Sequence, residues 1–324
     1  GGTENDDDDV RINQVGTGAE FTAFITSIAG RILNGALVGV SNITGGRAFL
    51  TANKDIGTSD KRLFTTIGSL QGISTTGSAF IFNDGEITTE TDDGTNTAFQ
   101  VATDFFLTAT SPVNVRQDII ATTGNINIVA NESSEIEYAA DFADDNTIAS
   151  EDDYDTVTVE ENINITASAG EINIWAGDHV VIESGALLNA SGDINIYTDV
   201  ATDSNDDLGN PLLGGQDPEV VSQQDRDDLD GGDVTITGTL TAGGNVLINT
   251  GAGGPGGLSA AVEQRDVITI TGIVTAGARI DILTGGDNDT VILSAATLTA
   301  PEMRVDGESG EDFIQIIDNN RFAG

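Results

Sequence analysis

The amino-acid sequence predicts an all-β fold, a parallel β-solenoid with inserted acidic loops. Three observations lead to this prediction. A short apolar–polar–apolar motif recurs along the chain, its copies are spaced as the coils of a β-helix are, and the 324 residues include 40 glycines but only 5 prolines. So many glycines indicate tight turns between short strands.

The recurring motif is a small or acidic residue followed by alternating apolar and polar residues. A period of two is typical of a half-buried strand, and Asn, Asp or Gly before the strand supplies the turn. The isoleucines of the motif are then expected to point inward and stack, and the asparagines between them to point outward as a ladder. The clearest copies are Gly124-Asn-Ile-Asn-Ile128, Glu161-Asn-Ile-Asn-Ile165, Gly170-Glu-Ile-Asn-Ile174 and Gly192-Asp-Ile-Asn-Ile196, with inward Ile126, Ile128, Ile163, Ile165, Ile172, Ile174, Ile194 and Ile196 and outward Asn127, Asn164, Asn173 and Asn195.

The spacing of the copies favours a solenoid over a β-sandwich. Several copies lie roughly 9 to 13 residues apart, and alternate copies lie roughly 20 to 23 apart where nothing intervenes. That is the length of one coil carrying two or three short strands. A sandwich also has short strands at about this spacing. It has no reason, however, to repeat the same local sequence in successive strands.

Three acidic or glycine-rich stretches interrupt the period, and we expect them to bulge from the coils as loops. They are residues 132–155, 199–230 and 251–264. Residues 1–120 are less regular and richer in phenylalanine, so they predict a distorted solenoid segment. Residues 121–324 predict regular β-helix coils. The only stretch that resembles an amphipathic helix is residues 22–37, and its glycines weaken that prediction.

The charge of the chain excludes nucleic acid as a partner. The sequence has 53 acidic and 12 basic residues, a formal net charge of −41, which repels phosphates. It suits divalent cations or a high-salt medium. Recurrent Ile, Val and Leu argue against disorder. The absence of cysteine rules out disulfides, and no apolar run approaches the roughly 20 residues of a membrane span.

Two segments resemble a known group of bacterial proteins. Asn53-Lys-Asp-Ile-Gly-Thr-Ser59, with Leu63 and Gly77-Ser-Ala-Phe-Ile-Phe-Asn-Asp-Gly85 after it, is similar to a segment of giant β-strand-repeat surface proteins related to filamentous haemagglutinin. The later Gly-x-Ile-Asn-Ile coils resemble the same group. The resemblance covers most of residues 50–320. It implies a right-handed parallel β-helix displayed outside the cell, and it implies no particular ligand.

A second resemblance is to the calcium-binding nonapeptide repeat G-G-x-G-x-D-x-U-x, where U is apolar. Gly307-Glu-Ser-Gly-Glu-Asp-Phe-Ile314 fits its core, Gly285-Gly-Asp-Asn-Asp-Thr-Val291 lacks one residue, and residues 1–10 form a looser version. Glycine turns would expose carbonyls while an Asp of the next coil completes an oxygen cage for Ca²⁺. An acidic turn entering a strand is the alternative. The first candidate ligands are Asp287, Asp289, Asp306 and Asp312.

An enzyme is the less favoured interpretation, and we predict no catalytic residue. Carboxylates are too abundant for any pair to be informative, and the arginines and lysines are scattered, so no groove for an acidic polysaccharide is indicated. His179, the only histidine, is expected to be an outward coil residue. Trp175 is also expected to face outward, either as a surface residue or stacked on a sugar. No hydrolase, zinc-protease or phosphate-binding motif is present.

The remaining interpretations are a binding or a structural role at the cell surface. A chain of this kind is either part of an adhesin stalk or a self-assembling subunit. Residues 2–13 and 306–318 carry variants of the repeated motif rather than a capping element, so we expect ends that continue a longer repeat or stack end to end. The expected partners are therefore other copies of the chain, with surface glycans or other cells as further partners. A polysaccharide-binding or polysaccharide-cleaving β-helix is the alternative function.

Overall fold

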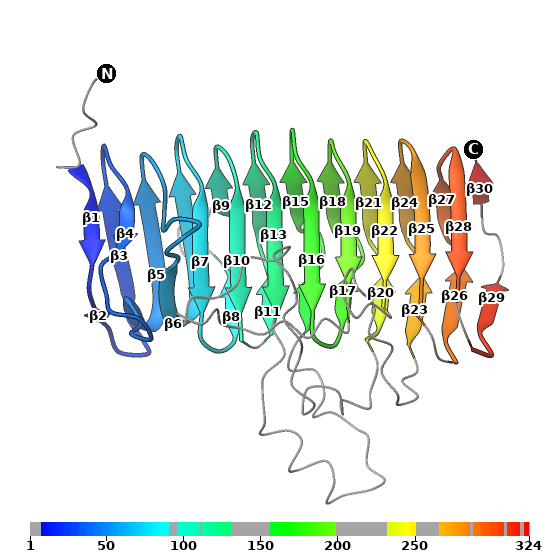
Figure 1. Cartoon of the computed structure of the whole chain (residues 1–324), viewed down its shortest axis with the longest axis horizontal. Coiled ribbons are helices and arrows are strands. Elements are labelled where there is room, and N and C mark those ends of the chain that lie inside the picture. The colour runs from blue at the N-terminus through cyan, green and yellow to red at the C-terminus, as the bar shows by residue number, and fades with distance from the viewer. Residues whose placement is uncertain are drawn as a thin grey trace, which may run out of the picture.

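The structure, a computed structural model, describes residues 8–90, 96–110, 112–130, 156–198, 232–250, 266–285, 288–307, 310–317 and 321–323. These residues form coils stacked along one long axis, from the N-terminal coil to the C-terminal coil (Figure 1). Paired strands run parallel, and each strand pairs with its counterparts in the coils before and after it. The predicted parallel β-solenoid is confirmed, and the described residues contain no α-helix.

Most coils contribute one short strand to each of three faces. The first face consists of β7 (Ala79–Asn83), β10 (Phe105–Ala109), β13 (Ile126–Ala130), β16 (Ile172–Ala176), β19 (Ile194–Tyr197), β22 (Val246–Asn249), β25 (Arg279–Leu283) and β28 (Glu302–Asp306). The second consists of β8 (Ile87–Thr89), β11 (Val113–Val115), β14 (Val157–Val159), β17 (Val180–Ile182), β20 (Val234–Ile236), β23 (Val267–Ile270), β26 (Thr290–Ser294) and β29 (Phe313–Ile317). The third consists of β9 (Thr97–Val101), β12 (Asp118–Ala121), β15 (Asn164–Ala167), β18 (Leu187–Ala190), β21 (Thr239–Ala242), β24 (Ile273–Ala276), β27 (Thr297–Thr299) and β30 (Arg321–Ala323).

The N-terminal coils are built differently. They consist of β1 (Val10–Ile12), β2 (Val15–Gly16), β3 (Thr22–Ser27), β4 (Ile32–Asn34), β5 (Ile43–Ala52) and β6 (Leu63–Ser74). With 10 and 12 residues, β5 and β6 are long, and β6 alone pairs with β7, β8 and β9. One strand thus runs where later coils have separate strands. The three-strand arrangement begins at β7.

Residues 22–37 form strands and turns, so the helix considered for them is wrong. β3 and β4 occupy most of this stretch, and the chain turns between them through Gly30. A side chain at Gly30 would collide with the backbone of Asp8 in the coil before it. The glycine is therefore a close contact between stacked coils, and it does not belong to a helix.

The core is a set of apolar columns that run the length of the solenoid. Ile126, Ile172 and Ile194 occupy one column of the first face and are fully buried. The other predicted inward isoleucines are also fully buried, except Ile163, which is only partly buried. The copy at 161–165 lies on the third face, where Ile165 pairs with Ile119 and Leu188. The four motif copies therefore serve two faces and do not form one column.

A column of small side chains ends the third face. Five alanines are direct partners in successive coils and all are buried: Ala121, Ala167, Ala190, Ala242 and Ala276. The chain bends sharply just after these positions to return to the first face. Val101, the partner of Ala121 in the coil before it, belongs to the same row and is also fully buried, so the row is small and apolar rather than restricted to alanine.

The three interruptions of the period leave the solenoid at the same corner. Neighbouring coils without an insertion are close in sequence, for example 22 residues apart at Asn173/Asn195 and 23 at Asp289/Asp312. The separation rises to 46, 52 and 34 residues at Asn127/Asn173, Asp193/Asn245 and Asp233/Val267. Each insertion connects a first-face strand to a second-face strand. The predicted loops 132–155, 199–230 and 251–264 themselves lie outside the described residues.

Candidate functional site: the corner aspartates

A ladder of aspartates lies at the corner where the chain passes from the first to the second face. The residue two positions before the second-face valine or isoleucine is Asp178, Gly232, Asp266, Asp289 or Asp312 in the coils from β17 to β29. The carboxylate of one coil accepts a hydrogen bond from the backbone N–H of the previous coil. The distances are 2.9 Å from Gly232 N to Asp266 Oδ1, 3.1 Å from Asp266 N to Asp289 Oδ1 and 3.3 Å from Asp289 N to Asp312 Oδ1.

Burial makes these bonds important for stability. Asp266 and Asp289 are 3% and 1% exposed, whereas Asp312, in the last coil, is exposed. A buried carboxylate is costly unless donors surround it, and a backbone N–H bonded to a carboxylate gives a stronger bond than a neutral pair. The sequence signal for this ladder is the Asp that precedes each alternating strand. The ladder explains that Asp without requiring a metal.

The structure brings two of the four predicted calcium ligands together. Asp289 and Asp312 lie in adjacent coils, with Thr290 paired to Phe313, so the two nonapeptide-like turns are stacked neighbours. A Cβ at Gly307 would contact the Asp312 side chain, which would have to shift to make room. Asp306 lies at the end of β28 and pairs with Arg304. Asp287 lies outside the described residues.

The described residues do not complete a metal site by themselves. Among them, no three His, Cys, Asp or Glu side chains are grouped closely enough to hold an ion. Calcium takes 6–8 oxygen ligands. Asp289 Oδ1 and Asp312 Oδ1 each already accept a hydrogen bond from a backbone N–H. Calcium binding at this corner therefore stays a prediction.

His179 belongs to the same corner, one position further along the chain. Asp233 donates its backbone N–H to Nδ1 of His179 at 3.1 Å, and Asp233 Oδ1 accepts from the backbone N of Val267 at 2.8 Å. Burial raises the pKa of Asp233, while the Val267 hydrogen bond and the nearby His179 oppose that rise. His179 thus packs between coils with Nδ1 as a hydrogen-bond acceptor.

Two side-chain ladders lie on the outer side of the first face. Asn173 donates to Asn127 Oδ1 at 3.0 Å, and Asn195 donates to Asn173 Oδ1 at 2.8 Å, so three predicted ladder members are linked. Asn164 lies on the third face and donates to Asp118 instead. Trp175 stacks on Tyr197, with ring centroids 6.2 Å apart and planes 7° from parallel. Each ring therefore covers one face of the other.

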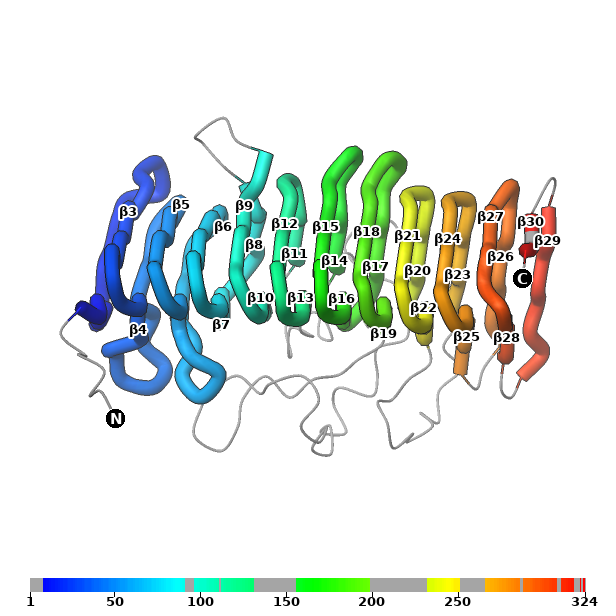
Figure 2. Tube along the Cα trace, turned by 90° about the horizontal axis from the view of Figure 1, so that it is seen from above, coloured from blue at the N-terminus to red at the C-terminus, as the bar shows by residue number. Residues whose placement is uncertain are grey.

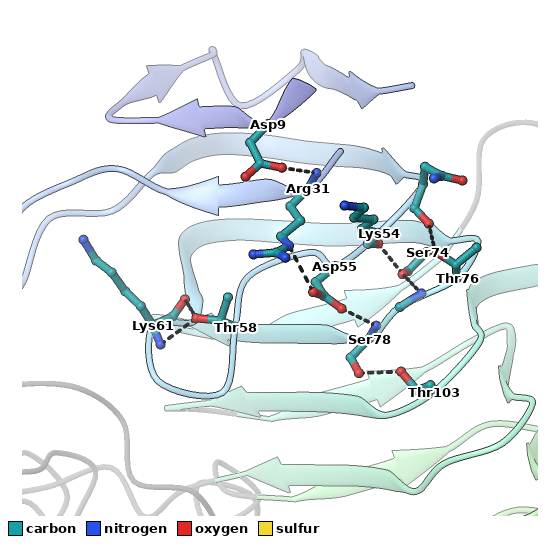
Figure 3. A network of polar contacts seen from close by, with 12 residues as sticks. Asp9, Arg31, Lys54, Asp55, Thr58, Lys61, Ser74, Thr76, Ser78 and Thr103 are labelled. Atoms are coloured by element: carbon teal, nitrogen blue, oxygen red, sulfur yellow. Dashed lines mark hydrogen bonds and ion pairs between the residues drawn. The ribbon is translucent and has the colours of Figure 1, made fainter. Parts of the chain in front are cut away.

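The corner between the third and first faces carries its own polar ladder (Figure 3). Here the side chain accepts from the following coil: Asp9 Oδ1 from Arg31 N at 2.8 Å and Asp55 Oδ1 from Ser78 N at 2.9 Å. Arg31 Nε also lies 3.5 Å from Asp55 Oδ2. A side chain at Gly77 would collide with the Asp55 carboxylate. At this corner the glycine leaves room for the neighbouring coil, and the polar residue after it takes part in hydrogen bonds between coils.

Sequence reasoning missed a buried cation. Arg62 is 4% exposed, its guanidinium carbon lies 4.2 Å from the centre of the Phe106 ring, and Nη1 donates to Thr108 Oγ1 at 2.6 Å. Burial lowers the pKa of Arg62 to about 10. No motif marks this arginine, because its contacts come from a strand far along the chain. It anchors the segment before β6 on the outer side of the first face.

Comparisons with protein-family models, with curated proteins and with solved structures returned no match. In the part of the chain that the structure describes, there is no helix with the length and apolar character of a membrane span.

Proposed function

We propose that this chain is a non-enzymatic structural segment of an extracellular or cell-surface fibre, related to the haemagglutinin-like repeat proteins that its motifs resemble. The observation that carries the proposal is the open apolar end of the last coil. Ile314 and Ile316 occupy inward columns, below Val291 and Leu293, yet they are 48% and 59% exposed. Met303, below the fully buried Ile280, is 38% exposed.

The open end favours a further coil as its occupant. A core column is apolar because another layer covers it, and contiguous exposed apolar groups on a soluble protein mark an interaction surface. The β28 and β29 edges also present backbone N–H and C=O groups that template another parallel strand. We propose that the occupant is a further coil of the same kind, supplied by a longer chain or by a second copy. A second copy would give a head-to-tail contact that propagates.

The N-terminal coils also expose apolar side chains. Ile28 and Leu37, in turns of the N-terminal coils, are 90% and 82% exposed, and Val38 is 60% exposed. A net charge of −41 opposes association of two copies, so stacking is expected to need salt or divalent cations that screen it.

Electron microscopy and sedimentation at micromolar concentration test the proposal. We expect fibres in about 0.15 M salt and fewer in low salt. Ile316→Asp, which places a charge in the contact, should leave single rods. Ile273→Asp is the matched control, because Ile273 is 46% exposed on the side of a middle coil. Single rods of the unsubstituted chain at all salt concentrations would contradict stacking and favour a segment of a longer stalk.

Calcium binding at Asp289 and Asp312 is a second part of the proposal, and melting curves test it separately. Calcium should raise the midpoint relative to chelator, and Asp312→Asn should remove most of that rise. Asp55→Asn, which alters the same kind of backbone-bonded carboxylate at the other corner, should leave it intact. Magnesium provides the comparison for unspecific screening. Equal midpoints with calcium and with magnesium would overturn the calcium site while leaving the fibre proposal standing.

A further inference from the structure

A hollow lies on the outer side of the N-terminal coils, where β6 passes from the second to the third face, far from the corner aspartates (β3, β5 and β6 in Figures 1 and 2). Its volume is about 230 Å³. Typical pockets for drug-sized ligands measure about 300–1,000 Å³, so this one suits a single ring. The side chains that matter for the argument are Phe24, Arg47, Phe49, Ser69, Gln71 and Glu90.

The strand register creates the hollow. Phe24, Phe49 and Gln71 are partners across β3, β5 and β6, and Arg47 and Ser69 are partners in a parallel row. Along each row a large side chain is followed by a shorter one. Gln71 is a less bulky side chain than Phe49, and Ser69 is shorter than Arg47, so space is left over the outer side of β6. Glu90, just after β8, borders that space.

One wall of the hollow is aromatic. Phe24 and Phe49 have ring centroids 5.9 Å apart, and Phe24 is 74% exposed. A phenylalanine ring left in water lacks the stabilisation that burial would give it. Two adjacent rings beside a concave surface form a platform for a ligand that has its own apolar face.

The other wall is polar and balanced in charge. Arg47 Nη2 lies 3.3 Å from Glu90 Oε1, and Glu90 Oε2 lies 3.9 Å from Arg116 Nη1. The guanidinium and the carboxylate are planar groups that donate and accept in fixed directions. Gln71 forms the floor and is only 3% exposed. The ion pair offsets the charge of Arg47, within a chain that is strongly negative overall. An anionic ligand therefore has little to gain here.

We propose that this hollow binds one neutral sugar ring, with an apolar C–H face of the ring on Phe24 and Phe49 and its hydroxyl groups bonded to Arg47 and Glu90, whose side chains are 42% and 27% exposed. A pyranose combines an apolar face with an edge of hydroxyls that both donate and accept, and that combination matches the two walls. The site goes beyond the proposed fibre function and does not depend on it. It would give a fibre side-on contact with glycans.

Saturation-transfer NMR with the purified chain tests the site, using methyl glycosides of glucose, galactose, mannose and N-acetylglucosamine and, for charge, methyl glucuronide. We expect at least one neutral glycoside to bind with a Kd on the order of millimolar. Phe24→Ala should weaken that binding about three- to tenfold. Phe21→Ala is the matched control. Phe21 lies near Phe24 in the sequence and is 67% exposed, but it does not line the hollow.

Three outcomes of the NMR experiment would overturn the proposal. They are no binding by any neutral glycoside, stronger binding of the glucuronide, or equal effects of Phe24→Ala and Phe21→Ala. Sedimentation of both variants at the NMR concentration tests whether a second copy of the chain occupies the hollow instead. If Phe24→Ala alone dissociates an oligomer, the aromatic wall is a contact between copies of the chain and the sugar site is refuted. None of these results bears on stacking at the last coil, which Ile316→Asp tests.

Discussion

Ile182, in a middle coil, and Ile316, in the last coil, occupy one inward column of the second face, linked through Ile236, Ile270 and Leu293. Ile182 is fully buried and Ile316 is 59% exposed. The two coils present the same alternating pattern to the interior, so the difference comes from their neighbours. In a solenoid, a coil's stability depends on the coils on either side, and the same residue is core or surface according to whether both are present.

The largest expected effect is a charge placed in that column. Ile182→Asp removes a fully buried side chain and introduces a carboxylate between two apolar neighbours, which should cost more than about 4 kcal/mol and unfold the surrounding coils. Ile316→Asp should cost less than about 1 kcal/mol, since that position is open to water. Urea unfolding followed by circular dichroism measures both. Comparable losses would mean that the last coil is covered in solution.

The sequence predicted the columns because apolar periodicity follows directly from strand geometry. Ile126, Ile172 and Ile194 share a column as expected. Ile163 and Asn164 do not, because the face to which a motif copy belongs depends on how many residues separate it from the previous strand. The insertion between β13 and β14 changes that count. The local pattern determines which residues of a strand point inward and which point outward. The face on which the strand lies depends on the number of residues between it and the strands before it.

The site residues also differ in whether a local motif or the path of the coils determines their position. Asp289 and Asp312 precede their strands in equivalent motifs, so the sequence identified them, and their stacking follows from a 23-residue separation. Asp306 also precedes a glycine turn, but its position at the end of β28 brings it to Arg304 instead. The hollow beside Phe24 had no signal at all. It arises because β5 and β6 run past the positions where later coils turn, which places unrelated residues side by side.

A smaller effect is expected for one row on the outer side of the first face. Asn173 makes two amide–amide hydrogen bonds, is 8% exposed and lies in the middle coils. The same row ends at Arg304, which is half-exposed and pairs with Asp306. Asn173→Ala should cost about 1–2 kcal/mol because two bonds are lost and neighbouring amides are left unsatisfied. Arg304→Ala should change the unfolding free energy by a few tenths of a kcal/mol. The same urea titrations measure both, and a larger loss for Arg304→Ala would show that the last coil depends on its surface ion pair.

The smallest effect concerns pH and the corner carboxylates. Burial raises the pKa of Asp233 in the folded chain above its unfolded value of about 3.9, so the folded state holds that proton more tightly. Folding stability from this group is therefore greatest at low pH and falls as pH rises from the unfolded pKa through the folded pKa. Asp233→Asn keeps an Oδ1 acceptor for Val267 N–H and removes the charge.

Asp233→Asn should therefore raise the melting midpoint by about 1–3 °C at pH 7 and by nothing at pH 3, where the aspartate is protonated in both states. Asp312→Asn in chelator is the matched control, because it removes one charge from the exposed end of the same corner. Differential scanning calorimetry from pH 3 to 8 gives both curves. An equal gain from Asp312→Asn would assign the effect to the net charge of −41 rather than to burial in the middle coils. A gain confined to Asp233→Asn would show that the corner carboxylates, like the isoleucine column, differ between middle and end because of the coils that cover them.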